Sequence, residues 1–305
     1  MIVNHRSLPL VAWPSLLSLD AVAVAITWQS VLVVSFLHRW PAWPESLSLG
    51  ATVWLIYVAD RLLDASRLDV TRPHTLRHQF YHRHAKLLIG GWMIVALGAA
   101  GLVITHLSFV LIRWGLMLSA LVLVYGASVH FVPSVVEGLT KSKGTEPTRR
   151  KWFPKEVQVG TLFACGVSLV IWPNLESRWA AFQLASTTVS MSVLFSVNCF
   201  AVARWEHELD LAQSFTNMDF RNHSTRTRLA MNLALLFVPV AALSIQLPMT
   251  LVAALAAGAL GMSWMMNRHD QVIPLVDNGI AHFEIRGIVV DALLWIPTAL
   301  CLMIP

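Results

Sequence analysis

Two pairs of carboxylates stand out, because the members of each pair are four residues apart and follow an apolar run. Asp60 and Asp64 follow the run that starts at Leu47, and Glu206 and Asp210 follow another far downstream. Residues four apart share a face of a helix, so each pair would project together from a helix end. Mg²⁺ binds one or two carboxylates and completes its shell with water and substrate phosphate. The spacing therefore indicates an oxygen-rich site that could hold a diphosphate through Mg²⁺ acting as a Lewis acid.

The composition places these residues in a membrane protein. Of the 305 residues, 56% are hydrophobic and only 13% are charged, and the mean hydropathy is +0.62. Soluble domains carry roughly 25% charged residues. A basic excess on such a chain reflects membrane topology and inner-leaflet lipid. We therefore expect the lipid bilayer, and no nucleic acid, as its surroundings.

Nine apolar stretches come close to the roughly 20 residues that are needed to cross a bilayer. They cover residues 15–37, 47–65, 86–105, 108–130, 157–174, 180–203, 228–246, 249–267 and 287–304. Separating the seventh from the eighth requires a tight turn at Gln246 and Pro248. The pattern predicts an all-α, multi-span helical bundle of about nine transmembrane helices. We expect one domain over residues 1–305, with cytoplasmic loops at about 66–85, 131–156, 204–227 and 268–286.

The basic residues give this bundle an orientation. If the N-terminus is cytoplasmic, all but three of the 22 Lys and Arg residues fall on the inner side, the exceptions being Arg39, Arg113 and Arg178. Cytoplasmic loops of membrane proteins carry such an excess. The count predicts a cytoplasmic N-terminus and an outer C-terminus, and we expect the bacterial inner (plasma) membrane. Both carboxylate pairs then lie on the cytoplasmic side.

Other side chains could complete a diphosphate site. Arg67 and Lys155 are candidates to contact phosphate, and Arg61 and Arg204 lie nearby in the sequence. Tyr57 could face a carbocation through its ring, although core packing explains it equally well. The carboxylates themselves could instead form ion pairs with arginines at the membrane interface.

In the number of its spans, its orientation and the placement of both carboxylate pairs, the chain resembles the UbiA superfamily of intramembrane prenyltransferases. Members are nine-helix bundles with Asp-rich motifs at the cytoplasmic ends of the second and sixth helices. The resemblance implies that Asp60 and Asp64 hold one Mg²⁺, and that Glu206 and Asp210 hold another. The tail Asp277-Asn278-Gly279, followed by Arg286 and Asp291, is also similar to the C-terminus of the family.

The chain departs from the family pattern at both motifs. The first family motif runs Asn-Asp-x-x-Asp-x-x-x-Asp, and Ile56 and Tyr57 occupy its first two positions here. In the second motif Cys199 stands where many members have Asp, and Asn198 beside it is the nearest polar substitute. The resemblance is therefore to a divergent member, with Asn198 expected to help bind substrate.

The expected function is Mg²⁺-dependent transfer of an isoprenyl group from a prenyl diphosphate to an aromatic or lipid acceptor, with Asp60 and Asp64 as catalytic residues. Two other functions stay open. One is a catalytically inactive bundle that binds a lipid or a partner protein, which the missing Asn-Asp pair favours. The other is an ion-coupled transporter, with Asp20, Asp60 and Glu206 as a polar path. The residues do not distinguish a general base, an acceptor or an oligomeric state.

Overall fold

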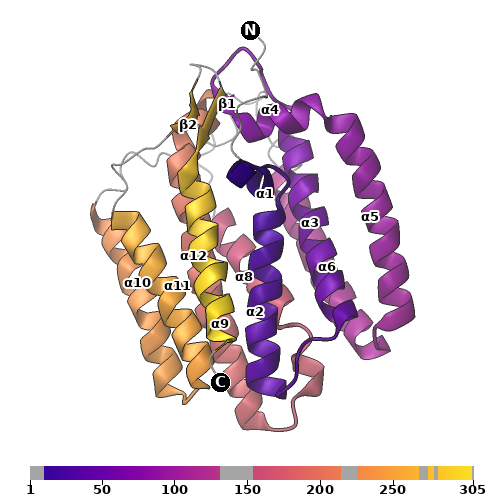
Figure 1. Cartoon of the computed structure of the whole chain (residues 1–305), viewed down its shortest axis with the longest axis vertical. Helices are drawn as coiled ribbons and strands as arrows, with labels where there is room; N and C mark the ends of the chain where they lie inside the picture. The colour runs from indigo at the N-terminus through magenta and orange to yellow at the C-terminus, as the bar shows by residue number, and fades with distance from the viewer. Residues whose placement is uncertain (1–9, 131–153, 214–224, 268–273, 278–280, 304–305) are drawn as a thin grey trace, which may run out of the picture.

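A computed structural model describes residues 10–130, 154–213, 225–267, 274–277 and 281–303. Its long helices run roughly side by side and form a bundle (Figure 1). The elements in chain order are η2 (Leu10–Ala12), α1 (Trp13–Leu16), α2 (Leu19–Leu37), α3 (Trp43–Ser66), β1 (His74–Thr75), α4 (Leu76–Arg83), α5 (Ala85–His106), α6 (Phe109–His130), α8 (Lys155–Ser168), η3 (Trp172–Asn174), α9 (Arg178–Ala212), α10 (Thr225–Ser244), α11 (Met249–Asn267), β2 (Pro274–Asp277), β3 (Ala281–Glu284) and α12 (Ile285–Cys301).

Each of the nine predicted spans falls on a helix of the bundle. Within the described part of the chain, 7 helical segments are long and apolar enough to cross a membrane. They are α2, α3, α5, α6, α8 together with η3, α9 and α11. The two remaining helices have shorter apolar stretches, since the apolar part of α10 covers Leu229–Ser244 and α12 has 17 residues. The protein is thus a helical membrane bundle, and the count of nine crossings stays a prediction.

Two left-handed backbone positions decide where helices begin and end near their predicted bounds. The predicted span 15–37 is broken at Ser18, whose φ is 59°, so α1 and α2 are separate helices. The predicted turn between the seventh and eighth spans is confirmed. Gln246 there has a φ of 53°, and Pro248 precedes the first residue of α11, where its fixed φ suits a helix start.

Helix α9 is longer than the predicted span 180–203. It has 35 residues, or about 52 Å at 1.5 Å per residue, against roughly 30 Å for a hydrocarbon core. The prediction of a loop from residue 204 is therefore wrong at its start, because the chain remains helical to Ala212. Glu206 and Asp210 lie in the last turns of this helix.

A small sheet and a short helix lie at one end of the bundle (Figure 1). The strand order is β1-β3-β2, with β1 parallel to β3 and β2 antiparallel to β3. Thr75 caps the N-terminus of α4, because its side chain accepts a hydrogen bond from the His78 N–H at 3.2 Å. The predicted loops 66–85 and 268–286 therefore contain regular structure. Of the predicted loop 131–156, residues 131–153 lie outside the described residues, as do Asn278 and Gly279 of the C-terminal motif.

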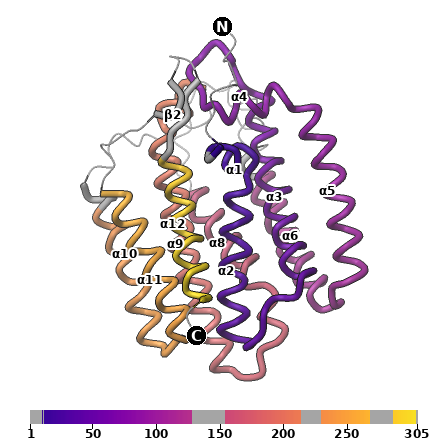
Figure 2. Tube along the Cα trace, in the orientation of Figure 1, coloured from indigo at the N-terminus to yellow at the C-terminus, as the bar shows by residue number. Residues whose placement is uncertain are grey.

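The core lies on the side of the bundle formed by α2, α8, α9, α10, α11 and α12. Trp28 on α2 is fully buried. Its indole N–H donates to the Leu294 carbonyl of α12 at 3.1 Å, and its ring meets Phe195 of α9 edge to face. Helix α5 has no buried residue and forms one flank of the bundle (Figure 2). Its apolar side chains are suited to contact with lipid.

Candidate functional site

A cavity of about 2010 Å³ lies between α2, α3, α6, α8, α9 and α12. Pockets for drug-sized ligands span roughly 300–1,000 Å³, so this one has room for a long-chain molecule and a second ligand. The structure brings all the residues of the predicted site to its walls. They are Tyr57, Asp60, Asp64, Arg67, Lys155, Asn198, Glu206 and Asp210.

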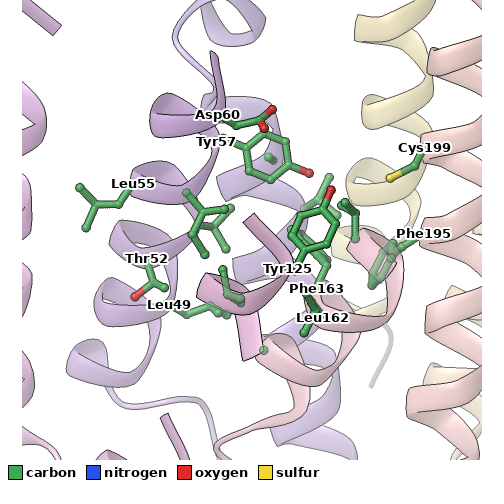
Figure 3. A pocket seen from close by; sticks show the side chains of 18 of the residues that line it. Leu49, Thr52, Leu55, Tyr57, Asp60, Tyr125, Leu162, Phe163, Phe195 and Cys199 are labelled. Carbon is green, nitrogen blue, oxygen red and sulfur yellow. The ribbon is translucent and has the colours of Figure 1, made fainter. Parts of the chain in front are cut away.

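The cavity has a charged end and an apolar body. Seven carboxyl groups, from α2, α3, α8, α9 and α12, line the charged end. They belong to Asp20, Asp60, Asp64, Glu156, Glu206, Asp210 and Asp291. One more lining carboxylate, Glu45, lies at the opposite end of α3. Figure 3 shows Leu49, Leu162 and Phe163 lining the cavity away from Asp60. Such a space fits an amphiphile with an ionic head and an apolar tail.

Helix α3 brings three charged side chains, Asp60, Arg61 and Asp64, to the charged end of the cavity. Asp60 and Asp64 line the cavity together, as their spacing predicts. Arg61, between them in sequence, is 9% exposed and donates to the Ser15 carbonyl at 2.8 Å. Its guanidinium also lies over the Tyr81 ring, 5.9 Å from the centroid. Arg61 therefore joins α3 to α1 and α4.

Arg77 of α4 neutralises one of the predicted metal ligands. Its Nη2 donates to both carboxylate oxygens of Glu206, at 3.2 and 2.9 Å. Burial alone would lower the pKa of Arg77, but the carboxylates around it, led by Glu206, raise that pKa above its usual value. The 129 residues between the two partners explain why sequence spacing gave no indication of this pair.

Asn198 of α9 connects to an acidic residue on another helix. Its side-chain N–H donates to Asp291 Oδ1 of α12 at 3.1 Å. Asp20 of α2 lines the same cavity. Asn198 thus holds the carboxyl group of Asp291 at the cavity wall.

The predicted cationic groups are divided by the structure. Lys155 is the first residue of α8 and Arg67 follows the last residue of α3, and both line the charged end. Arg204, on the described part of α9, is not among the residues that line this cavity. Lys155 and Arg67 therefore lie where they could contact a phosphate, as predicted, whereas Arg204 does not line the site.

The described carboxylates at the charged end are arranged so that two of them, but not three, could bind one Mg²⁺ ion. Among the residues that the structure describes, no three His, Cys, Asp or Glu side chains gather closely enough to hold one ion. Mg²⁺ needs only one or two carboxylates when water and phosphate complete its octahedron. The Asp60–Asp64 pair therefore fits a metal that arrives with a phosphate ligand, whereas Glu206 would first have to leave Arg77.

The sequence prediction missed three residues at this site, namely Arg77, Tyr125 and Glu156. In Figure 3 the Tyr57 and Tyr125 side chains both enter the cavity near Asp60. Phe163 and Phe195 lie beside them, with ring centroids 4.9 Å apart in an edge-to-face pair. Of the three, only Tyr125 had a signal in the sequence, because it is a tyrosine near the end of a predicted span. Nothing in the local sequence distinguishes Arg77 or Glu156.

Comparison with known proteins finds no matching family model, no similar curated protein and no similar solved structure. The resemblance to the UbiA superfamily accordingly remains an inference from the residues and their spacing.

Proposed function

We propose that the protein is a membrane-embedded prenyltransferase-like enzyme of the UbiA type. It would transfer an isoprenyl group from a prenyl diphosphate to an aromatic or lipid acceptor, with Mg²⁺ as cofactor. The observation that carries this proposal is the shape and chemistry of one cavity. Predicted residues from α3, α8 and α9 meet at its charged end, and an apolar body continues from there.

Each part of the cavity has a task in this reaction. Asp60 and Asp64 would hold Mg²⁺, which would neutralise the diphosphate and make it a better leaving group. Lys155 and Arg67 would contact phosphate oxygens directly. The apolar body would bind the isoprenyl tail and keep water from the allylic cation that forms when the carbon–oxygen bond breaks. The Tyr57 ring could stabilise that cation through its face.

The proposed orientation follows from the basic residues. The charged end would face the cytoplasm, with nine crossings, a cytoplasmic N-terminus and an outer C-terminus, in the bacterial inner membrane. Asp60, Asp64, Glu206 and Asp210 line the same end of one cavity, which supports placing both carboxylate pairs on one side of the membrane.

The test is a ligand-dependent change in thermal stability. The detergent-purified protein is heated with geranylgeranyl diphosphate, with and without Mg²⁺, because a ligand that binds the folded state raises its apparent melting temperature. We expect a Mg²⁺-dependent rise that is absent in Asp60→Asn/Asp64→Asn. The matched control is Asp69→Asn, which removes a carboxylate that bonds Thr71 and Arg72 outside the cavity and should retain the rise. No rise with prenyl diphosphates of several lengths would refute the proposal.

A second candidate function is transport, and one observation favours it. The cavity lining on α3 continues from Glu45 to Asp64, which is about 28 Å along the helix and close to the thickness of a hydrocarbon core. An ion-coupled transporter would show cation- or proton-dependent flux in vesicles without any diphosphate. The concentration of carboxylates at one end favours the enzyme.

The inactive-bundle alternative makes a simpler prediction. A protein that only binds lipid or a partner would bind a prenyl diphosphate equally well with and without Mg²⁺, and Asp60→Asn would leave that binding unchanged.

A further inference from the structure

Glu156 is a buried carboxylate for which the proposed reaction has so far given no role. It lies in the first turn of α8, is 3% exposed and lines the charged end of the cavity. Its Oε2 is fully buried, and no described residue donates a hydrogen bond to it. A buried charged oxygen without a donor is costly. The folded protein therefore keeps one carboxylate oxygen, Oε2, in a place where its own described side chains do not satisfy it.

The local structure explains why a negative charge is tolerated there. The helix dipole favours a negative charge in the first turn, and the residue before α8, Pro154, makes no capping hydrogen bond with its side chain. Lys155 does not complete the carboxylate, since adjacent helical residues point in different directions. The favourable field of the helix end does not replace a hydrogen-bond donor, and no residue in the described part of the chain supplies one to Oε2. The position is therefore suited to a ligand that carries a donor group.

We propose that Glu156 binds the second substrate of the enzyme, by accepting a hydrogen bond from its O–H or N–H group, and takes that proton when the new bond forms. This inference rests on the proposed function. In the reaction, the prenyl carbon–oxygen bond breaks and its electron pair leaves with the diphosphate. The acceptor supplies the electron pair of the new bond to the prenyl carbon, and its proton passes to the Glu156 carboxylate.

The surroundings of Glu156 match this role. Phe163 follows it by seven residues, two helical turns, and therefore shares its face of α8, and both residues line the cavity. Phe163 forms the edge-to-face pair with Phe195 of α9. An acceptor could thus place an apolar body against Phe163 and its donor group against Glu156. The diphosphate would lie across the cavity on α3, at Asp60 and Asp64.

The first test needs no ligand. Glu156→Gln keeps the size of the side chain and removes the buried charge, so the apparent melting temperature of the purified protein should rise by about 2–4 °C. The matched control is Glu176→Gln, the same change at an exposed position, which should leave the melting temperature unchanged. A lower melting temperature in Glu156→Gln would show that the carboxylate has structural partners, and this would overturn the proposal.

The second test measures the hydrogen bond with a pair of probes. The dissociation constants of 1-naphthol and 1-methoxynaphthalene are measured by quenching of tryptophan fluorescence. The ratio of the two constants is then compared between variants, because the partition of each probe into detergent is the same for every variant and cancels. Naphthol should bind the wild type about tenfold more tightly than the ether, as expected for a hydrogen bond to a charged group. The preference should become weaker in Glu156→Gln, because a neutral amide oxygen accepts a weaker hydrogen bond than a carboxylate, and should persist undiminished in Glu176→Gln. Equal affinities in the wild type, or an undiminished preference in Glu156→Gln, would overturn the proposal.

The two proposals fail in different ways. Loss of the Mg²⁺-dependent response to geranylgeranyl diphosphate would refute the prenyl diphosphate site, whatever the naphthol pair shows. A normal response to the diphosphate with no role for Glu156 in stability or probe binding would refute only the acceptor site.

Discussion

Arg77 and Glu206 form an ion pair of 2.9 Å between α4 and α9 at the charged end of the cavity. Their side chains are 19% and 26% exposed, so water screens the pair only in part. The contact holds α4 against the last turns of α9, and it pairs the Glu206 carboxylate with a guanidinium of the protein.

We expect Arg77→Gln to destabilise the fold by about 1–3 kcal/mol, because Glu206 is left with a partly buried, uncompensated charge. Glu206→Gln in the same background should recover part of this loss. A double-mutant cycle on the free energy of unfolding in detergent measures the coupling. The exposed pair Arg72–Asp69, with side chains 55% and 44% exposed, is the control, and Arg72→Gln should change stability by less than about 0.5 kcal/mol. Equal effects at both pairs would contradict this assignment.

The bond from Asn198 to Asp291 predicts a charge swap. Asn198→Asp should destabilise the protein by about 1–3 kcal/mol, because Asp291 loses its donor and gains a like charge. Asn198→Asp/Asp291→Asn exchanges donor and acceptor across the same 3.1 Å contact and should recover most of the loss. Apparent melting temperatures of the wild type and of these two variants decide the point. A double variant no more stable than Asn198→Asp would show that the contact is not what matters.

His78 predicts a loss of stability in acid. Burial, followed by repulsion from Arg77, lowers its pKa from 6.5 to about 4. The neutral imidazole is therefore preferred in the folded state. Its contribution is complete above pH 6.5 and is lost between pH 6.5 and 4, as the unfolded chain takes up the proton first. The loss is at most about 3 kcal/mol.

The measurement for His78 is the apparent melting temperature as a function of pH. Wild type should lose stability over that interval more steeply than His78→Gln. His38→Gln, which changes an exposed histidine, should follow the wild-type curve. A wild-type curve parallel to that of His78→Gln would rule out this contribution.

The fold could be predicted to the extent that its signals are local. Runs of apolar residues set the positions of the helices, and Gln246 with Pro248 marked a turn, because these properties need no distant partner. The break at Ser18 carried no comparable sign, since a serine adopts a left-handed conformation only where packing requires it. The length of α9 beyond residue 203 was missed because polar residues in a helix leaving the membrane have the same composition as a loop.

The candidate site, like the fold, was predictable where its residues are related by spacing within one helix, and not where they meet across helices. Asp60 and Asp64 follow from a spacing within one helix. The bond between Asn198 and Asp291, and the contact of Arg77 with Glu206, depend on which helices meet, and a single sequence contains no measure of that. Burial of Glu156 is likewise a tertiary property, because a glutamate beside a lysine at a helix start is ordinarily a solvated residue.

Gly160 sets the distance between the two helices that carry Glu156 and Asn198. A Cβ at this position would lie 2.8 Å from the Cα of Ser196 on α9 and closer still to its Oγ. Because the contact is with backbone, the helices would have to separate. We expect Gly160→Ala to destabilise the protein by about 1–3 kcal/mol and to weaken binding at the charged end.

Gly166, on the same helix, supplies the control for this change. A Cβ there would meet no atom of Leu118 closer than 3.8 Å, so Gly166→Ala should be neutral or stabilise the helix by up to about 1 kcal/mol. Both variants are compared by melting temperature and by the shift with geranylgeranyl diphosphate and Mg²⁺. A stable Gly160→Ala protein with an undiminished shift would mean that the close approach of α8 and α9 is not needed to position the site.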